Sequence, residues 1–163
     1  MIVILMGVTG TGKTTIGKLL ASRTGWQFAE GDDYHSEANK AKMHAGIPLT
    51  DADRAPWLAS LHDVLRAWLD NGQSGILACS ALKQTYRDTL IAGIPSGAYR
   101  FVWLNVSREH LVERLAKRTG HYMSPALLDS QIVTLEIPSG AIAVSAEGTP
   151  EETVESILKQ LGV

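Results

Sequence analysis

A glycine-rich stretch near the start of the chain constrains the fold more than any other feature. Residues 7–14 read GVTGTGKT and fit the pattern G-x-x-x-x-G-K-[ST]. A short apolar run, Ile2–Met6, precedes them, and Lys13–Thr24 follows with apolar residues at helical spacing. In such a unit, backbone N–H groups surround phosphate oxygens and the helix adds its positive N-terminal end. The sequence therefore predicts a phosphate-binding loop; a glycine-rich turn without a ligand is the weaker alternative.

Short apolar runs alternate with amphipathic segments along the rest of the chain. Further strands are predicted at 26–29, 75–79, 100–106 and 141–145. Further helices are predicted at 53–71, 83–92, 107–119 and from 150 onward, with Ser107 and Thr149 as N-caps and Pro56 in a first turn. This alternation is typical of an α/β fold, here a P-loop NTPase with a five-stranded parallel sheet and helices on both faces.

Size, charge and cysteine content narrow the class of protein. The 163 residues suggest one domain, 1–163. A formal net charge of −2 gives no reason to expect binding to nucleic acid, and no apolar run approaches the length of about 20 residues that spans a bilayer. The single cysteine, Cys79, cannot form an internal disulfide, and we expect it in the core of a strand. We therefore expect a soluble, cytoplasmic protein.

The phosphate-binding loop predicts ATP and Mg²⁺ as cofactors. Lys13 should reach the β- and γ-phosphates, and the Thr14 hydroxyl should be a ligand of Mg²⁺. The residues expected to bind nucleotide are Gly7, Val8, Thr9, Gly10, Thr11, Gly12, Lys13, Thr14, Thr15 and, later in the chain, Arg114.

Acidic residues near this loop distinguish GTPases from small-molecule kinases among P-loop proteins. The Asn-Lys-x-Asp base reader of GTPases is missing, because residues 39–42 read NKAK. The strands 75–79 and 100–106 do not end in an acid, so the nearest candidates are Asp32 and Asp33, after the strand at 26–29. Such an acid can contact Mg²⁺ or accept a proton from a substrate hydroxyl, as small-molecule kinases require. The alternative is that both aspartates are turn residues beside Gly31.

The polar segment 31–58 resembles the gluconate kinase family. The matching residues are Gly31-Asp32, His35, Asn39, Lys42-Met43, Gly46-x-Pro48-Leu49, Asp51-x-Asp53-Arg54 and Pro56-Trp57-Leu58. Later matches are Cys79–Lys83, Tyr86-Arg87, Arg114, Arg118, Gly120–Met123, Leu127–Gln131 and Leu135-Glu136. The resemblance covers about residues 4–137. Ser36, where proline is frequent, Tyr122, where phenylalanine is usual, and a short connection at 136–141 depart from the pattern.

The resemblance implies a nucleoside-monophosphate-kinase-like arrangement, with a substrate-binding segment at about 31–58 and a lid at about 118–126. It implies transfer of the γ-phosphoryl group of ATP to O6 of D-gluconate, and it suggests a homodimer. Asp32 is then expected near both Mg²⁺ and O6, where it assists removal of the O6 proton. His35 is expected to donate to a substrate hydroxyl or to orient Asp32. Arg54 is expected to bind the gluconate carboxylate or a hydroxyl; its alternative is an ion pair with Asp51 or Asp53.

Further basic residues lie at the predicted edge of the site. Lys83 and Arg87 are four residues apart, which places both on one helix face, as substrate-binding cations or as a solvated basic face. Arg114 and Arg118 have the same spacing. Arg118 is expected to stabilise charge on the transferred phosphoryl group; the alternative is that both are cations placed favourably near a helix C-terminus. His121 is expected to contact substrate or nucleotide.

Two rival functions remain open at this point. A kinase of the same architecture could act on another small acid such as shikimate, but the residues from Lys42 to Leu58 resemble gluconate kinases rather than shikimate kinases. A nucleotide-binding regulatory module would lack the set of acidic and cationic residues described above. Trp57 and Trp68 are expected in the core or in a subunit contact rather than against a sugar.

Overall fold

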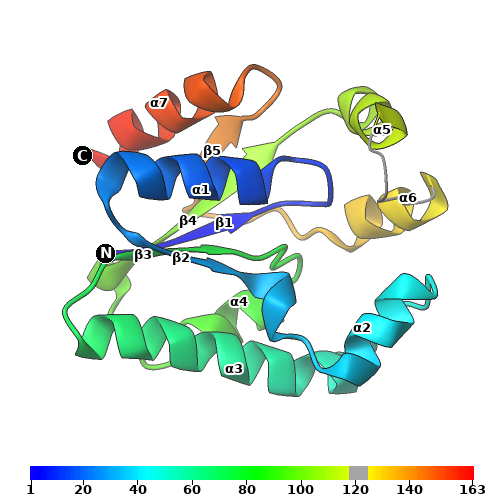
Figure 1. Cartoon of the computed structure of the whole chain (residues 1–163), viewed down its shortest axis with the longest axis horizontal. Coiled ribbons are helices and arrows are strands. Elements are labelled where there is room, and N and C mark those ends of the chain that lie inside the picture. The colour runs from blue at the N-terminus through cyan, green and yellow to red at the C-terminus, as the bar shows by residue number, and fades with distance from the viewer. Residues whose placement is uncertain (118–124) are drawn as a thin grey trace.

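Strand β1 (Ile2–Met6) forms the centre of the sheet in the computed structural model, which describes residues 1–117 and 125–163 (Figure 1). All five of its side chains are buried, as expected for a strand covered on both faces. It pairs in parallel with β3 (Gly75–Ala78) and β4 (Tyr99–Asn105). The edge strands are β2 (Gln27–Glu30) and β5 (Ile142–Ser145), which gives the order β2-β3-β1-β4-β5. The predicted five-stranded parallel sheet is confirmed.

Helices cover both faces of this sheet. The helical elements are α1 Lys13–Thr24, η1 Gly31–Tyr34, α2 Glu37–His44, α3 Asp51–Asp70, α4 Gln84–Leu90, η2 Ser96–Ala98, α5 Arg108–Lys117, α6 Pro125–Thr134 and α7 Pro150–Leu161. Helices α1 and α7 lie on one face, and α3 and α4 lie on the other (Figure 1). Each face has its own cluster of buried apolar side chains. Among the described residues, none of the helices combines the length and the hydropathy that crossing a membrane requires.

Two of the predicted helix starts are confirmed by their caps. The Ser107 hydroxyl accepts the N–H of His110 at 3.3 Å at the start of α5, and Thr149 accepts the N–H of Glu152 at 3.2 Å at the start of α7. Strand β1 and helix α1 have the predicted bounds, and strands β2 to β5 differ from prediction by one residue at one or both ends.

Helix α3 begins two residues before its predicted start. Thr50 is its N-cap and forms a reciprocal capping box with Asp53. Pro56 is therefore the sixth residue of the helix, and the prediction that it lies in the first turn is wrong. The missing proline N–H leaves the carbonyl of Ala52 without its helical donor. Both residues are exposed, so water can satisfy that carbonyl and the helix continues.

Sequence periodicity did not predict α2 or α6. Helix α2 has a single buried residue, the polar Asn39, so it lacks the apolar stripe that would reveal it. Its only local signal is the N-cap Ser36, whose hydroxyl accepts the N–H of Asn39 at 3.1 Å. Contacts with the start of α3, described below, hold it in place.

A glycine in β3 allows α3 to approach the sheet closely. A Cβ atom at Gly75 would lie 2.3 Å from Cε3 of Trp68, which is itself buried. We expect Gly75→Ala to lower the free energy of unfolding by about 1–3 kcal/mol, because the indole or the strand must shift. Gly97→Ala is the matched control, since a Cβ there meets nothing within 4 Å. Chemical denaturation of both variants measures this difference; equal stability would contradict the close packing.

Candidate active site

The phosphate-binding loop lies between the carboxyl end of β1 and the start of α1. Gly7 and Gly12 have φ angles of 150° and 94°, which favour glycine. A Cβ at Gly7 would also lie 3.0 Å from the carbonyl oxygen of Leu104 in the neighbouring strand. Local conformation and the packing of the loop against β4 therefore both require glycine at position 7.

Polar side chains fix the path of the loop from inside. The buried Thr11 hydroxyl donates to the carbonyl oxygen of Val8 at 2.9 Å. The Lys13 ammonium donates to the carbonyl oxygens of Gly7 and Val8 at 2.9 and 3.0 Å. Lys13 therefore lies against the loop whose phosphates it is predicted to contact.

The acid that contacts Thr14 is Glu30, which sequence reasoning missed. The Thr14 hydroxyl donates to the Glu30 carboxylate. The apolar run predicts a strand that ends at Ala29, whereas β2 continues to Glu30. The sequence signal for Glu30 is an acidic residue at the carboxyl end of a strand beside the phosphate-binding loop.

The donors around Thr14 suit Mg²⁺. In the described part of the chain, no group of three or more His, Cys, Asp or Glu side chains could hold a metal by itself. Mg²⁺ usually takes one or two protein oxygens and completes its shell with phosphate oxygens and water. The hydroxyl of Thr14 and the carboxylate of Glu30 are oxygen donors of this kind.

Asp32 lies in η1, directly after β2, where it is exposed. Its charge, with those of Lys13 and Glu30, acts on the Cys79 thiol at the end of β3. These three charged groups therefore lie near the end of β3, at the carboxyl edge of the sheet. Burial raises the pKa of the Cys79 thiol to about 12, so it stays protonated, in agreement with the core position predicted for it.

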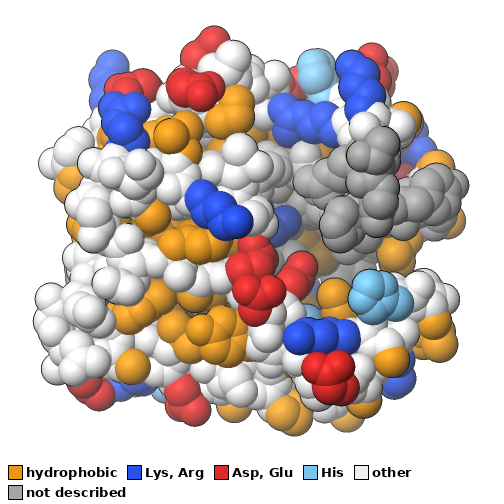
Figure 2. All heavy atoms as spheres, viewed as in Figure 1, with side chains coloured by type: hydrophobic (Ala, Val, Ile, Leu, Met, Phe, Trp, Pro, Cys, Tyr) orange, Lys and Arg blue, Asp and Glu red, His pale blue; other side chains and the backbone are white. Residues whose placement is uncertain are grey.

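The neighbouring Asp33 lines a hollow on the flank of α1. Thr14 and Glu30, the oxygen donors described above, line the same hollow, together with Lys18 and Tyr34. In the space-filling view, acidic side chains gather near the middle of this face, with basic side chains on either side (Figure 2). Both aspartates lie in the 3-10 turn, and Asp32 is the one whose charge acts on both His35 and Cys79.

His35 is held between α2 and α3. Its side chain is buried and stacks on Trp57, with ring centroids 4.1 Å apart and an interplanar angle of 15°. The Trp57 indole N–H donates to the carbonyl oxygen of Gly31 at 2.7 Å. Burial lowers the pKa of His35, which keeps the ring neutral at neutral pH. Trp57 is a core residue, as predicted, and it also fixes the turn that carries Asp32.

Arg54 and Lys83 are brought together around Tyr86. The Arg54 guanidinium donates to the Tyr86 hydroxyl at 3.0 Å, and this hydroxyl donates to the Asp51 carboxylate at 2.6 Å. Asp51 also lies 3.6 Å from Arg54 and 3.9 Å from Lys83. The Tyr86 hydroxyl bond and the two cations lower the pKa of Asp51. The ion pair between Arg54 and Asp51, which the sequence left open as an alternative, is therefore present. Lys83 shares the same Asp51 carboxylate.

The predicted common face of Lys83 and Arg87 is not formed. Lys83 is the N-cap residue of α4, outside the helix, whereas Arg87 is only 2% exposed. The guanidinium of Arg87 donates to the carbonyl oxygens of Ala81, Leu82 and Glu136 and to the Gln84 side chain. The Nη groups of Arg87 thus hold the chain segments around α4 together, and its assignment to the substrate stays a prediction.

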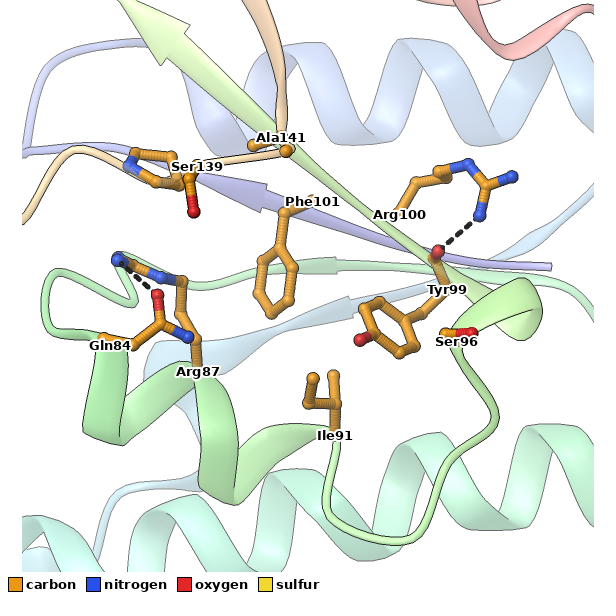
Figure 3. Close-up of a pocket in the computed structure, with 11 residues that line it drawn as sticks. Gln84, Arg87, Ile91, Ser96, Tyr99, Arg100, Phe101, Ser139 and Ala141 are labelled. Atoms are coloured by element: carbon orange, nitrogen blue, oxygen red, sulfur yellow. Dashed lines mark hydrogen bonds between the residues drawn. The ribbon is translucent and has the colours of Figure 1, made fainter.

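A separate hollow of about 320 Å³ lies on the α4 side of the sheet (Figure 3). Tyr99 and Phe101 of β4 line it, facing Ile91 directly after α4, and Arg87 lies at its edge beside Gln84. Its strand residues are the first ones of β4, at the amino end of the sheet. Ligands of open α/β sheets bind at the carboxyl ends, so this hollow is not the phosphate site.

Arg114 reaches the phosphate-binding loop from α5. Its guanidinium donates to the carbonyl oxygen of Gly10 at 3.2 Å and to that of Ala146, which follows β5. From α6, the Gln131 side-chain oxygen accepts the N–H of Thr9 at 2.8 Å. The segments on both sides of the predicted lid therefore contact the loop. Arg118, His121 and most of the lid predicted at 118–126 lie outside the described residues.

Helix α2 is tied to the start of α3 by Asp53. Its carboxylate accepts from Lys42 at 2.8 Å and from the N–H of Thr50 at 2.9 Å, and these bonds lower its pKa to about 2 from an ordinary value of 3.8. Because the pKa is lower in the folded protein, this stabilisation is present above about pH 4 and is lost as the pH falls towards 2.

We therefore expect Asp53→Asn to lower the midpoint temperature of unfolding at neutral pH. Between about pH 4 and 2 this midpoint should fall less steeply with decreasing pH in the variant than in the wild type. Thermal unfolding followed by circular dichroism across this range measures both effects. In a Lys42→Gln background the Asp53 substitution should change the midpoint less, because the strongest partner is already gone. An unchanged effect in that background would show that Lys42 does not hold Asp53.

The amino-acid sequence of this chain is similar to those of known kinases. The shikimate kinase family model matches residues 9–137. The gluconokinase of Gluconobacter oxydans is 47% identical, over 96% of this chain and 88% of its own length. This chain belongs to the gluconokinase family. The resemblance found in the sequence is thereby confirmed.

Solved structures agree with the family. A gluconokinase from Sinorhizobium meliloti 1021 is 41% identical with a TM-score of 0.88, covering 98% of this chain and 90% of that one. A shikimate kinase from Aquifex aeolicus has a TM-score of 0.62 at 19% identity, covering 99% and 96%. The similarity to the shikimate kinase shows the P-loop kinase fold alone, whereas the similarity to the gluconokinase includes the amino-acid sequence.

Proposed function

We propose that this protein transfers the γ-phosphoryl group of ATP to O6 of D-gluconate, forming 6-phospho-D-gluconate and ADP, with Mg²⁺. One observation carries the proposal: the phosphate-binding loop, the Asp32 carboxylate and the Arg54–Lys83 pair all lie at the carboxyl edge of the sheet. The names of the gluconokinase relatives support the choice of acceptor.

The nucleotide half of the site is assigned to the loop. Backbone N–H groups and Lys13 hold the triphosphate, and a bound Mg²⁺ would neutralise charge on the phosphate oxygens. Thr14 and Glu30 are the residues that would hold Mg²⁺, directly or through water. Arg114, which already contacts Gly10, is assigned to the nucleotide side.

The acceptor half is assigned to η1 and its neighbours. Asp32 accepts the proton of O6 as the hydroxyl attacks the γ-phosphorus, the role of a general base. It can also contact the metal through water. His35, neutral and close enough for its pKa to be affected by the Asp32 charge, donates to a substrate hydroxyl. The attack thus takes place between Asp32 and the end of the phosphate-binding loop.

The gluconate carboxylate is assigned to Arg54 and Lys83. Among the described residues these two cations share one carboxylate, that of Asp51, so the cluster there keeps an excess positive charge. A guanidinium binds a carboxylate through two parallel hydrogen bonds, which gives both affinity and orientation. Of the other predictions, transition-state stabilisation by Arg118, the contact of His121, the homodimer and the cytoplasmic location stay predictions.

The test is ADP release from Mg-ATP with gluconate, shikimate or a nucleoside monophosphate as acceptor. We expect stimulation by gluconate alone. Stimulation by shikimate would favour the related kinase, and nucleotide binding with no stimulation at all would favour a regulatory module. Either result would overturn the substrate assignment.

Arg54→Gln probes the carboxylate site in the same assay. We expect the KM for gluconate to rise about 10- to 100-fold, because a charged hydrogen bond is lost, while the KM for ATP changes little. Arg66→Gln is the matched control, because Arg66 also lies on α3 but pairs only with Asp70, 3.6 Å away. An unchanged KM for gluconate in the Arg54 variant would remove Arg54 from the site.

A further inference from the structure

The amide of Asn39 connects His35 with the start of α3. Asn39 is buried although it lies in the otherwise exposed helix α2. Its Nδ2 lies 2.8 Å from the carbonyl oxygen of Asp53 and 3.3 Å from Nδ1 of His35. A buried amide that uses one nitrogen for two partners constrains both of them.

These two contacts determine which imidazole nitrogen carries the proton. A backbone carbonyl oxygen only accepts hydrogen bonds, so the Asn39 atom that faces Asp53 must be the NH₂ group. The second hydrogen of this group is then directed at His35, whose Nδ1 must accept it without a proton of its own. The proton of the neutral ring therefore lies on Nε2.

The other nitrogen of His35 remains available to a ligand. In the described residues, Nε2 has no hydrogen-bond partner, and the one fully buried unpartnered side-chain nitrogen is Nε of Arg87. Nε2 is therefore in contact with solvent. The charges that act on the ring come from Asp32 on η1, which raises its pKa, and from Arg54 on α3 and Lys40 on α2, which lower it together with burial.

We propose that Asn39 is a positioning residue that holds His35 as the Nε2–H tautomer, so that the acceptor site presents a neutral hydrogen-bond donor beside Asp32. The proposal rests on the assignment of His35 to a substrate hydroxyl. Such a donor pairs with a hydroxyl or carboxylate oxygen of a polyol acid while leaving Asp32 ionised to accept a proton. A charged imidazolium at the same place would stabilise the Asp32 carboxylate and weaken it as a base.

Nitrogen NMR of the histidine rings tests the tautomer without any substrate. His62 is an internal reference for the opposite state, because its Nδ1 lies 2.9 Å from the carbonyl oxygen of Leu90 and must carry a proton. At neutral pH we expect Nε2–H for His35 and Nδ1–H for His62, with the His35 signals assigned from their loss in His35→Gln. An Nδ1–H or charged His35 in the wild-type protein would overturn the proposal.

Asn39→Asp tests whether the amide is the cause. A carboxylate at position 39 has no hydrogen to donate, so His35 must place its proton on Nδ1 to keep the contact, and its pKa should rise. We expect kcat/KM for gluconate to fall about 10- to 100-fold, with the KM for ATP within about twofold of wild type. The acidic limb of the pH profile should move to higher pH.

Lys42→Gln is the control for simple loosening of α2. Lys42 also connects α2 to Asp53 but does not contact His35. This variant should share any loss of thermal stability and keep the wild-type tautomer and kinetics. If both variants lose activity equally with the tautomer unchanged, Asn39 has only a structural role. If the tautomer switches in Asn39→Asp but gluconate turnover does not change, the tautomer is correct and the substrate contact of His35 is wrong.

Discussion

The Asp32→Asn enzyme is expected to bind ATP and gluconate but to turn over about 10²–10⁴-fold more slowly than the wild type, the range typical of a lost general base. The amide keeps the size of the side chain and removes the proton acceptor. Asp32 lies in the turn after β2, and its charge reaches both His35 and the end of β3. Steady-state kcat, with nucleotide affinity measured separately by fluorescence titration, reports this loss.

Asp33→Asn is the comparison, because it changes the next residue of the same turn in the same way. Asp33 lines the hollow beside Thr14 and Glu30, and its charge is not among those that act on His35. We expect its kcat to fall less than that of Asp32→Asn. A large loss at Asp33 with a small one at Asp32 would exchange the two assignments and place the proton acceptor on the α1 flank.

Lys13→Met should lower kcat by about 10²–10³-fold, because a fixed positive charge is lost where charge develops on the transferred phosphoryl group. It should also weaken ATP binding. In the structure, the Lys13 ammonium lies against the carbonyl oxygens of Gly7 and Val8, so the substitution removes these bonds too.

Lys18→Met provides the comparison for Lys13. It lies on the same helix, one turn and a half further on, and its side chain is exposed. Thermal unfolding of both variants separates loss of catalysis from loss of folding. Near-normal turnover in a folded Lys13→Met protein would contradict the role of the phosphate-binding loop.

Local sequence patterns predicted the parts of this protein whose structure depends on nearby residues. The strand, loop and helix from Ile2 to Thr24 have their predicted bounds, because burial of one apolar run, glycine at positive φ and helical spacing act over a few residues. The caps at Ser107 and Thr149 are local in the same way. The family resemblance added the acceptor segment, which composition alone left as a polar loop.

Contacts between distant segments decided the environment of the individual side chains. Arg87 has the residue type of a substrate-binding cation, yet its side chain is buried. There it donates a hydrogen bond to the carbonyl oxygen of Glu136, which lies 49 residues away in the chain. Glu30 contacts Thr14 only because β2 continues one residue further than its apolar run indicates.

The state of His35 also depends on tertiary structure. Trp57 and Asn39 reach it from two different helices, and they set its burial and the direction of its hydrogen bonds. Sequence by itself determined which chemical groups this protein has and the order in which they follow one another along the chain. Which of these groups face a ligand, and in which protonation state, depends on packing between segments far apart in the chain, because burial and hydrogen-bond partners exist only once those segments meet.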